Sequence, residues 1–253
     1  MEIFESFADP SGPLSFMTRG AHVLSGITWI GLLYFFNFVQ VPAYAELSDG
    51  ARSEALRKLT YRALWWFRYA ALMTFLFGLV LLTIEGDGEN MDLYLDGQNG
   101  TAILTGALLG TTMFLNVWGV IWRKQKVVIG NAENVAAGGE ADPAAPAAAK
   151  AGARASRCNT FFSIAMLWYM VFAAHGSWFG LDDPGAFPGT VGYWVLVLAI
   201  WAFVEASALG WVGGLDNAFN KLVFDSHRNT IIGGFVLLAV LHFVGWELIL
   251  NPS

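Results

Sequence analysis

The segment FMTRGAHVLSGITWIGLLYFFNFVQVP, residues 16–42, decides the fold class of this chain. It carries no charged residue after Arg19. It is also long enough to cross the hydrocarbon core of a bilayer, which is roughly 30 Å thick and takes about 20 apolar residues in a helix. We therefore expect a transmembrane helix. His22 stands near its first end, and an ionisable side chain in hydrocarbon must be satisfied by protein, water or a cofactor.

The composition extends this reading to the whole chain. Of 253 residues, 56% are hydrophobic and only 13% are charged, whereas soluble domains have about 25% charged residues. The sequence predicts an all-α fold, a polytopic membrane helical bundle surrounded by lipid, with residues 1–253 forming a single membrane domain. The six expected spans are residues 16–42, 63–84, 101–122, 159–180, 191–212 and 230–250. The net charge of −6 and the absence of a basic patch exclude a nucleic-acid-binding protein.

The positions of the basic residues predict the orientation of the spans. Lys and Arg are confined almost entirely to the loops after the first, third and fifth spans, and the remaining loops have none. By the positive-inside rule these three loops are cytoplasmic and both termini are periplasmic, in a bacterial inner membrane. Residues 130–156 are rich in Ala, Gly and Pro, with Pro143 and Pro146 expected to interrupt any helix. We expect this stretch to be a flexible cytoplasmic linker.

Three histidines fall in the outer half of their spans. His22, His175 and His242 lie roughly 9, 7.5 and 12 Å from the outer ends, at 1.5 Å per residue. Two such imidazoles on facing helices suit a non-covalently bound b-type haem, and small residues such as Gly26 would admit the macrocycle. His22 and His175 are the preferred axial pair. His242 is either a substitute ligand or a residue that hydrogen-bonds to a ligand. All three could instead hold copper or zinc, or each could be hydrogen-bonded separately within the bundle.

Two further charged residues lie inside spans. Glu205 is the only acidic residue well within a span, where a bare carboxylate is costly and needs to be protonated, paired or hydrated. Arg68 starts from the same inner side at a similar depth. We expect Arg68 either to reach the nearby interface with its long side chain or to pair with Glu205.

The sequence also resembles a known family, the membrane domain of the membrane-bound urate hydroxylases, also called the urate oxidase N-terminal family. The resemblance covers roughly the first 180 residues. It is carried by HVLSGITWIGLLYFFNFV (22–39), WWFRYAALMTFLFGLVLL (65–82), NVWGVIWRKQKVVI (116–129) and SRCNTFFSIAMLWYM (156–170) followed by His175. In that family a c-type cytochrome domain commonly follows, and urate is oxidised with electrons passed to the respiratory chain. We expect this chain to lack the cytochrome domain, because it stops at Ser253 without a C-x-x-C-H string.

These observations lead to one main hypothesis and two alternatives. The main one is a haem b protein of electron transfer or of respiratory-chain-linked oxidation, in the second case a membrane-bound oxidoreductase similar to urate hydroxylase. Its expected partner is cytochrome c, a quinone or a larger membrane complex. The first alternative is a haem-free accessory subunit of a larger complex. The second is a small-solute or proton pathway that uses Glu205 and the histidines. The catalytic residues and the substrate are not identified by the sequence.

Overall fold

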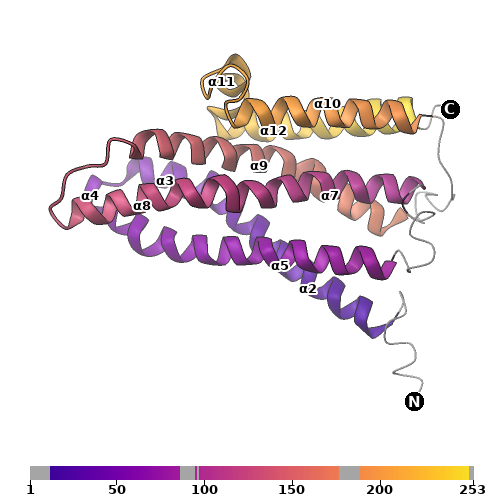
Figure 1. Ribbon diagram of the computed structural model, residues 1–253, viewed down its shortest axis with the longest axis horizontal. Coiled ribbons are helices and arrows are strands. Elements are labelled where there is room, and N and C mark those ends of the chain that lie inside the picture. The colour runs from indigo at the N-terminus through magenta and orange to yellow at the C-terminus, as the bar shows by residue number, and fades with distance from the viewer. Residues whose placement is uncertain (1–11, 86–94, 96, 177–188, 251–253) are drawn as a thin grey trace.

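The computed structural model describes residues 12–85, 95, 97–176 and 189–250, and these are helical with short turns (Figure 1). The longer helices lie side by side in one bundle. The helical elements are α2 Pro13–Tyr34, η1 Phe35–Gln40, α3 Val41–Glu46, α4 Asp49–Ala55, η2 Leu56–Thr60, α5 Tyr61–Glu85, α7 Gln98–Asn116, η3 Val117–Ile121, α8 Trp122–Ala136, α9 Ala145–Ala174, α10 Thr190–Ala208, α11 Ala218–Phe224, α12 His227–Ala239 and η5 Val240–Leu250. Those marked η are π-helical and continue the α-helices beside them.

Five stretches of helix are long and apolar enough to cross a membrane. They are Pro13–Glu46, Asp49–Ile84, Gln98–Ala136, Thr190–Ala208 and His227–Leu250. They contain four of the six expected spans and all but the last four residues of a fifth, 191–212, which supports the expected all-helical membrane fold. The remaining expected span, residues 159–180, begins within α9, which is not among these five stretches. The mean hydropathy of this span is lowered by Asn159, Thr160 and Ser163. These three residues are buried against other helices and face no lipid.

Helix α9 runs through the centre of the bundle. Its residues Cys158, Phe162, Ala165 and Tyr169 have no exposed surface. It packs against α7 and α8 on one side and α12 on another, while α2 packs mainly against α5. Figure 1 shows the pair α10 and α12 along one side of α9, with α2 and α5 on the opposite side. Helix α9 therefore contacts other helices over much of the surface that an outer helix would present to lipid.

The stretch 130–156, expected to be a flexible linker, is mostly helical, and that expectation was wrong. Helix α8 continues to Ala136, and α9 begins at Ala145. Pro146 lies in the first turn of α9, where its missing N–H leaves no hydrogen bond unmade. The alanine-rich segment after it has the highest intrinsic helix propensity. The alanine and proline composition therefore belongs to the first turns of a helix. Helices α8 and α9 form a helical hairpin whose connection lies at one end of the bundle (Figure 1).

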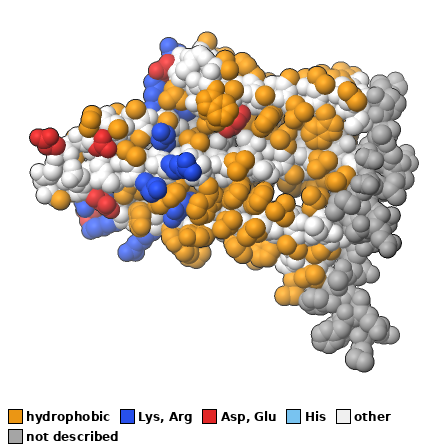
Figure 2. All heavy atoms as spheres, viewed as in Figure 1, with side chains coloured by type: hydrophobic (Ala, Val, Ile, Leu, Met, Phe, Trp, Pro, Cys, Tyr) orange, Lys and Arg blue, Asp and Glu red, His pale blue; other side chains and the backbone are white. Residues whose placement is uncertain are grey.

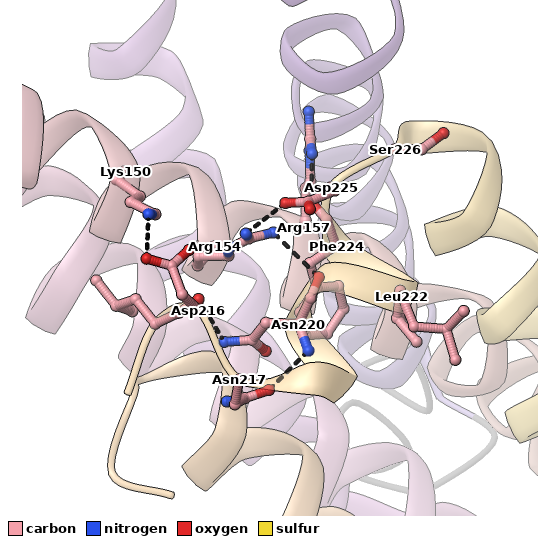
Figure 3. A network of polar contacts seen from close by, with 12 residues as sticks. Lys150, Arg154, Arg157, Asp216, Asn217, Asn220, Leu222, Phe224, Asp225 and Ser226 are labelled. Carbon is pink, nitrogen blue, oxygen red and sulfur yellow. Dashed lines mark hydrogen bonds and ion pairs between the residues drawn. The ribbon is translucent and has the colours of Figure 1, made fainter. Parts of the chain in front are cut away.

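A polar network fixes the connection between α10 and α12 to α9 (Figure 3). Arg154, which is buried, donates to the carboxylate of Asp225 at 2.5 Å and to the carbonyl of Asn220 at 3.2 Å. Arg157 donates to the carbonyl of Phe224. Lys150 pairs with Asp216 at 2.5 Å. Because all three cations come from successive turns of α9, they hold α11 against that helix.

The basic residues gather toward one end of the bundle. Figure 2 shows Lys and Arg side chains over the half that contains α4, α8 and the start of α9, and mostly hydrophobic side chains over the other half. This is the distribution expected of a membrane protein with one basic end. The terminal residues 1–11 and 251–253, whose periplasmic placement the sequence predicted, lie outside the described residues.

Candidate functional site

His22 lies on the face of α2 that packs against α5. Its Nδ1 atom is 2.8 Å from the carbonyl oxygen of Thr74. A carbonyl only accepts, so Nδ1 carries the ring proton and the lone pair of the neutral ring is on Nε2. The ring sits beside Gly78, where an added Cβ would come 3.1 Å from His22 Cε1. The absence of a side chain at Gly78 therefore makes room for the imidazole.

His175 caps the carboxyl end of α9. Its Nδ1 atom is 2.9 Å from the carbonyl oxygen of Val171, one turn earlier in the same helix. By the same reasoning the proton is on Nδ1 and the lone pair is on Nε2. His22 and His175 thus share one tautomer, held in each case by a backbone carbonyl. Histidines that ligate metals characteristically donate their other ring N–H in this way.

The two histidines are the same number of residues away from a contact between their helices. The hydroxyls of Tyr34 on α2 and Ser163 on α9 are 2.9 Å apart, and Asn37 donates to Ser156 at 2.9 Å. As residue numbers rise along α2 they fall along α9, so the two helices are antiparallel. His22 precedes Tyr34 by 12 residues and His175 follows Ser163 by 12 residues, which is about 18 Å along each helix. Figure 1 shows α2 crossing the bundle obliquely, so these two helices diverge toward the ends that carry the histidines.

His242, on η5, is in a different environment. Its ring makes edge contacts with Trp168 and Phe172 of α9, at 5.4 and 5.5 Å between ring centroids. Its Nε2 atom is 3.9 Å from a carboxylate oxygen of Glu247. Its Nδ1 atom is buried without a hydrogen-bond partner among the described residues. Its ring nitrogens therefore differ in setting from those of His22 and His175.

The three histidines do not form one ligand set. Among the described residues no group of three or more His, Cys, Asp or Glu side chains could hold a metal ion. A haem iron needs only two axial protein ligands, so this finding concerns a three-ligand copper or zinc site and leaves a two-histidine haem site as a prediction. Gly26, expected beside a cofactor, faces α5 instead, where an added Cβ would lie 3.8 Å from Thr74 Cγ2.

Glu205 belongs to a buried polar cluster at the junction of α7, α9 and α10. One of its carboxylate oxygens accepts from the amide of Asn116 at 3.1 Å and from the thiol of Cys158 at 3.4 Å. The Asn116 amide also donates to Asn159 Oδ1 at 3.0 Å, and the Asn159 amide donates to the Met113 carbonyl at 2.9 Å. The side chains of Asn116, Cys158, Asn159 and Glu205 are all buried.

The expected pairing of Glu205 with Arg68 is wrong. Arg68 is buried and its guanidinium lies flat against α8, with Cζ 3.4 Å from the ring centroid of Trp122. The positive charge of Arg68 thus lies against the π face of Trp122. Beside Glu205, the neutral amide of Asn116 donates a hydrogen bond where a cation was expected. Two asparagines within apolar runs were the sequence signal for this cluster, but only the packing shows that they meet.

An apolar groove on the described surface does not include these residues. It has a volume of about 680 Å³ and lies between α10, α11 and α12. Its lining includes Phe203, Leu222, Ile232 and Val236, all at least half exposed, and one amide, Asn229. In a bilayer this apolar groove faces acyl chains, and it offers no set of groups for chemistry.

Fold and site together define a polytopic helical membrane protein with two histidines held in a ligand-competent tautomer and a buried polar cluster near its centre. Residues 91–213 match the family model described as urate oxidase N-terminal, so this part of the chain is similar to that family. The match starts later than the resemblance noted in the sequence and extends through α10. It includes His175 and the whole Glu205 cluster, and it excludes His22 and His242. Searches of curated proteins and of solved structures gave no match.

Proposed function

We propose that this chain is a membrane electron-transfer protein related to the urate hydroxylases, which binds b-type haem through His22 and His175. The observation that carries the proposal is their common tautomer, since each ring has its Nδ1 proton fixed by a backbone carbonyl and its Nε2 lone pair directed elsewhere. His242 is the substitute ligand.

A b-type haem in this position would supply a one-electron redox centre. The role of the chain is to hold the ligand rings and to exclude water. Thr74 orients His22 through its carbonyl, and Val171 orients His175 in the same way. The similarity of residues 91–213 to the urate oxidase N-terminal family supports an oxidation linked to the respiratory chain, with cytochrome c, a quinone or a larger membrane complex taking the electrons. Urate is the substrate that the family name suggests.

The proposed topology has six spans, with α9 supplying the fourth. The basic loops face the cytoplasm and both termini face the periplasm of a bacterial inner membrane, which puts His22 and His175 near the periplasmic side. Reporter fusions in the turn between α8 and α9 and after Ser253 test this arrangement. We expect a cytoplasmic signal from the first and a periplasmic signal from the second. The reverse pattern would place the histidines on the cytoplasmic side.

The experiment that tests haem binding is a reduced-minus-oxidised absorption spectrum of the purified protein, together with iron and copper analysis. We expect an α band of the b type and about one iron per chain. His22→Ala and His175→Ala should each lose or shift that band while the protein still inserts, and His227→Ala, at an exposed position, is the matched control. A folded protein without iron would contradict the proposal and favour a haem-free accessory subunit. Copper in place of iron would favour the alternative in which the histidines hold copper.

If His242→Ala abolishes the band and His175→Ala leaves it unchanged, the second ligand is on η5. That result would place α2 and η5 across the haem in place of α2 and α9. It would also make the carbonyl contact of His175 an ordinary helix-end interaction. A normal spectrum in His242→Ala leaves His22 and His175 as the pair.

A second candidate function, a proton pathway, is favoured by the Glu205 cluster. A carboxyl group buried in a span and bonded to an amide and a thiol, with no cation within ion-pair distance among the described residues, is the kind of group that proton-conducting membrane proteins use. Proton flux into liposomes, measured with a pH-sensitive dye, tests this function. We expect flux to stop in Glu205→Gln, whose amide oxygen still accepts from Asn116. Equal flux in both proteins would rule Glu205 out.

A further inference from the structure

Arg68 is held by aromatic rings from two helices. The guanidinium Cζ is 3.4 Å from the ring centroid of Trp122, and it lies within 5.6 Å of the ring centroids of Tyr69 and Trp118. Its Nε–H donates to the Leu64 carbonyl of its own helix at 3.2 Å. The orientation of the side chain is therefore fixed by one hydrogen bond and one close stacking contact.

The remaining donors of Arg68 have no acceptor among the described residues. A guanidinium carries five N–H groups, and four of them are on the two terminal nitrogens. In the part of the chain that the structure describes, these nitrogens make no hydrogen bond and no carboxylate lies within ion-pair distance. These nitrogens have no partner but are not fully buried, so they keep some surface that opens to the outside of the bundle. The edge of the guanidinium thus presents its donors outward.

A second cation approaches the same indole ring. The Nζ atom of Lys126, which is exposed, lies 5.7 Å from the centroid of Trp122. Lys126 also has no ion pair among the described residues. Arg68 and Lys126 thus both bring positive charge to the surroundings of Trp122, which favours a negatively charged ligand there.

The level of Arg68 in the bundle identifies the anion. Arg62, exposed at the start of α5, is six residues earlier, which is about 9 Å along the helix. Trp65 and Trp66, 46% and 61% exposed, lie between them, as expected at the boundary between headgroups and hydrocarbon. A ligand at this depth needs an anionic group for Arg68 and a hydrocarbon part for the apolar surface around it. A phospholipid has both.

We propose that Arg68, Lys126 and Trp122 form a binding site for the phosphate of an anionic phospholipid in the leaflet at the basic end of the protein. Arg68 donates two parallel N–H groups from its edge to the phosphate oxygens, as guanidinium groups do. Lys126 adds charge from the headgroup side. Trp122 holds the guanidinium plane so that the donors face the lipid. This site is separate from the proposed haem ligands, because Arg68 lies six residues, about 9 Å along α5, from Thr74, whose carbonyl holds His22.

Native mass spectrometry of the full chain in phosphatidylcholine nanodiscs, titrated with phosphatidylglycerol, tests the site. The wild-type protein should retain one phosphatidylglycerol, bound at least about tenfold more tightly than phosphatidylcholine. Arg68→Gln should lose that preference, and Lys126→Gln, at an exposed position with no packing role, should weaken it about threefold or more. Arg62→Gln removes one charge from the same helix without touching the site and should change the affinity less than about twofold.

Three outcomes would overturn the proposal. The first is equal retention of phosphatidylglycerol by the wild-type protein and Lys126→Gln, or by a folded Arg68→Gln with wild-type helix content. The second is equal weakening by Arg62→Gln, which would show a diffuse attraction of basic residues. The third is competition by millimolar inorganic phosphate in the absence of anionic lipid, which would identify a small soluble anion as the ligand. If Arg68→Gln does not fold, the Lys126→Gln result decides.

Discussion

Gly234 on α12 is packed closely against α9, and replacing it by alanine gives a defined prediction. A Cβ atom there would lie 2.6 Å from Ile164 Cδ1 and 2.9 Å from the carbonyl oxygen of Phe161. Ordinary contacts for a Cβ fall between 3.4 and 4 Å. Ile164 can change its side-chain rotamer, but the Phe161 oxygen belongs to the backbone of α9. Relief therefore requires α12 to move away from the central helix.

The magnitude follows from two opposing effects. Overpacking of a well-filled interior costs about 1 to 3 kcal/mol. Alanine in place of glycine within a helix recovers about 1 kcal/mol of helix propensity. We expect Gly234→Ala to lower the free energy of unfolding by up to about 2 kcal/mol. Gly31→Ala on α2 is the matched control, because an added Cβ there meets nothing within 4 Å and the same propensity gain stabilises the helix.

Unfolding in mixed micelles of increasing dodecyl sulfate content, followed by circular dichroism, measures the difference between these variants. Gly234→Ala should unfold at a lower dodecyl sulfate fraction than the wild type, and Gly31→Ala at the same or a higher fraction. The predicted gap between the two variants is about 1 to 3 kcal/mol, because the propensity term cancels. Equal stabilities for Gly234→Ala and Gly31→Ala would refute the close packing of α12 on α9.

Three further predictions concern other parts of the bundle. Gly78→Ala should disturb His22, whose Cε1 would be 3.1 Å from the new Cβ. The fraction of haem-loaded protein should fall more than in Gly31→Ala, and an unchanged fraction would contradict the ring position. Cys158 is the only cysteine and is fully buried, so a maleimide should label it only after unfolding, and rapid labelling of the folded protein would contradict this packing. The hydrogen bond from Lys150 lowers the pKa of Asp216 below its ordinary 3.8, so this pair stabilises the fold above that value and its contribution disappears as the pH falls through the lowered pKa. The difference in Tm between wild type and Lys150→Met should therefore vanish in acid, and a pH-independent difference would refute the ion pair.

The sequence alone determined that this is a membrane bundle of long helices. The apolar runs are long and carry few charges, so their burial in lipid follows from transfer free energy without reference to any particular neighbour. The tendency of Lys and Arg to collect at one end was also readable, because it depends only on their place between the spans. The family resemblance rested on local strings of residues and required no tertiary information.

Tertiary structure decided the partners of the polar side chains. Whether Glu205 meets Arg68 or Asn116 depends on how α5, α7 and α10 are rotated about their axes, and the hydropathy of a span does not contain that rotation. The shared carbonyl-bound tautomer of His22 and His175 likewise depends on local packing and helix-end geometry. The helical start of α9 at Ala145 and Pro146 was missed because alanine and proline are common both in linkers and in first helical turns. Contacts with α7, α8 and α12 make the helix the stable choice there.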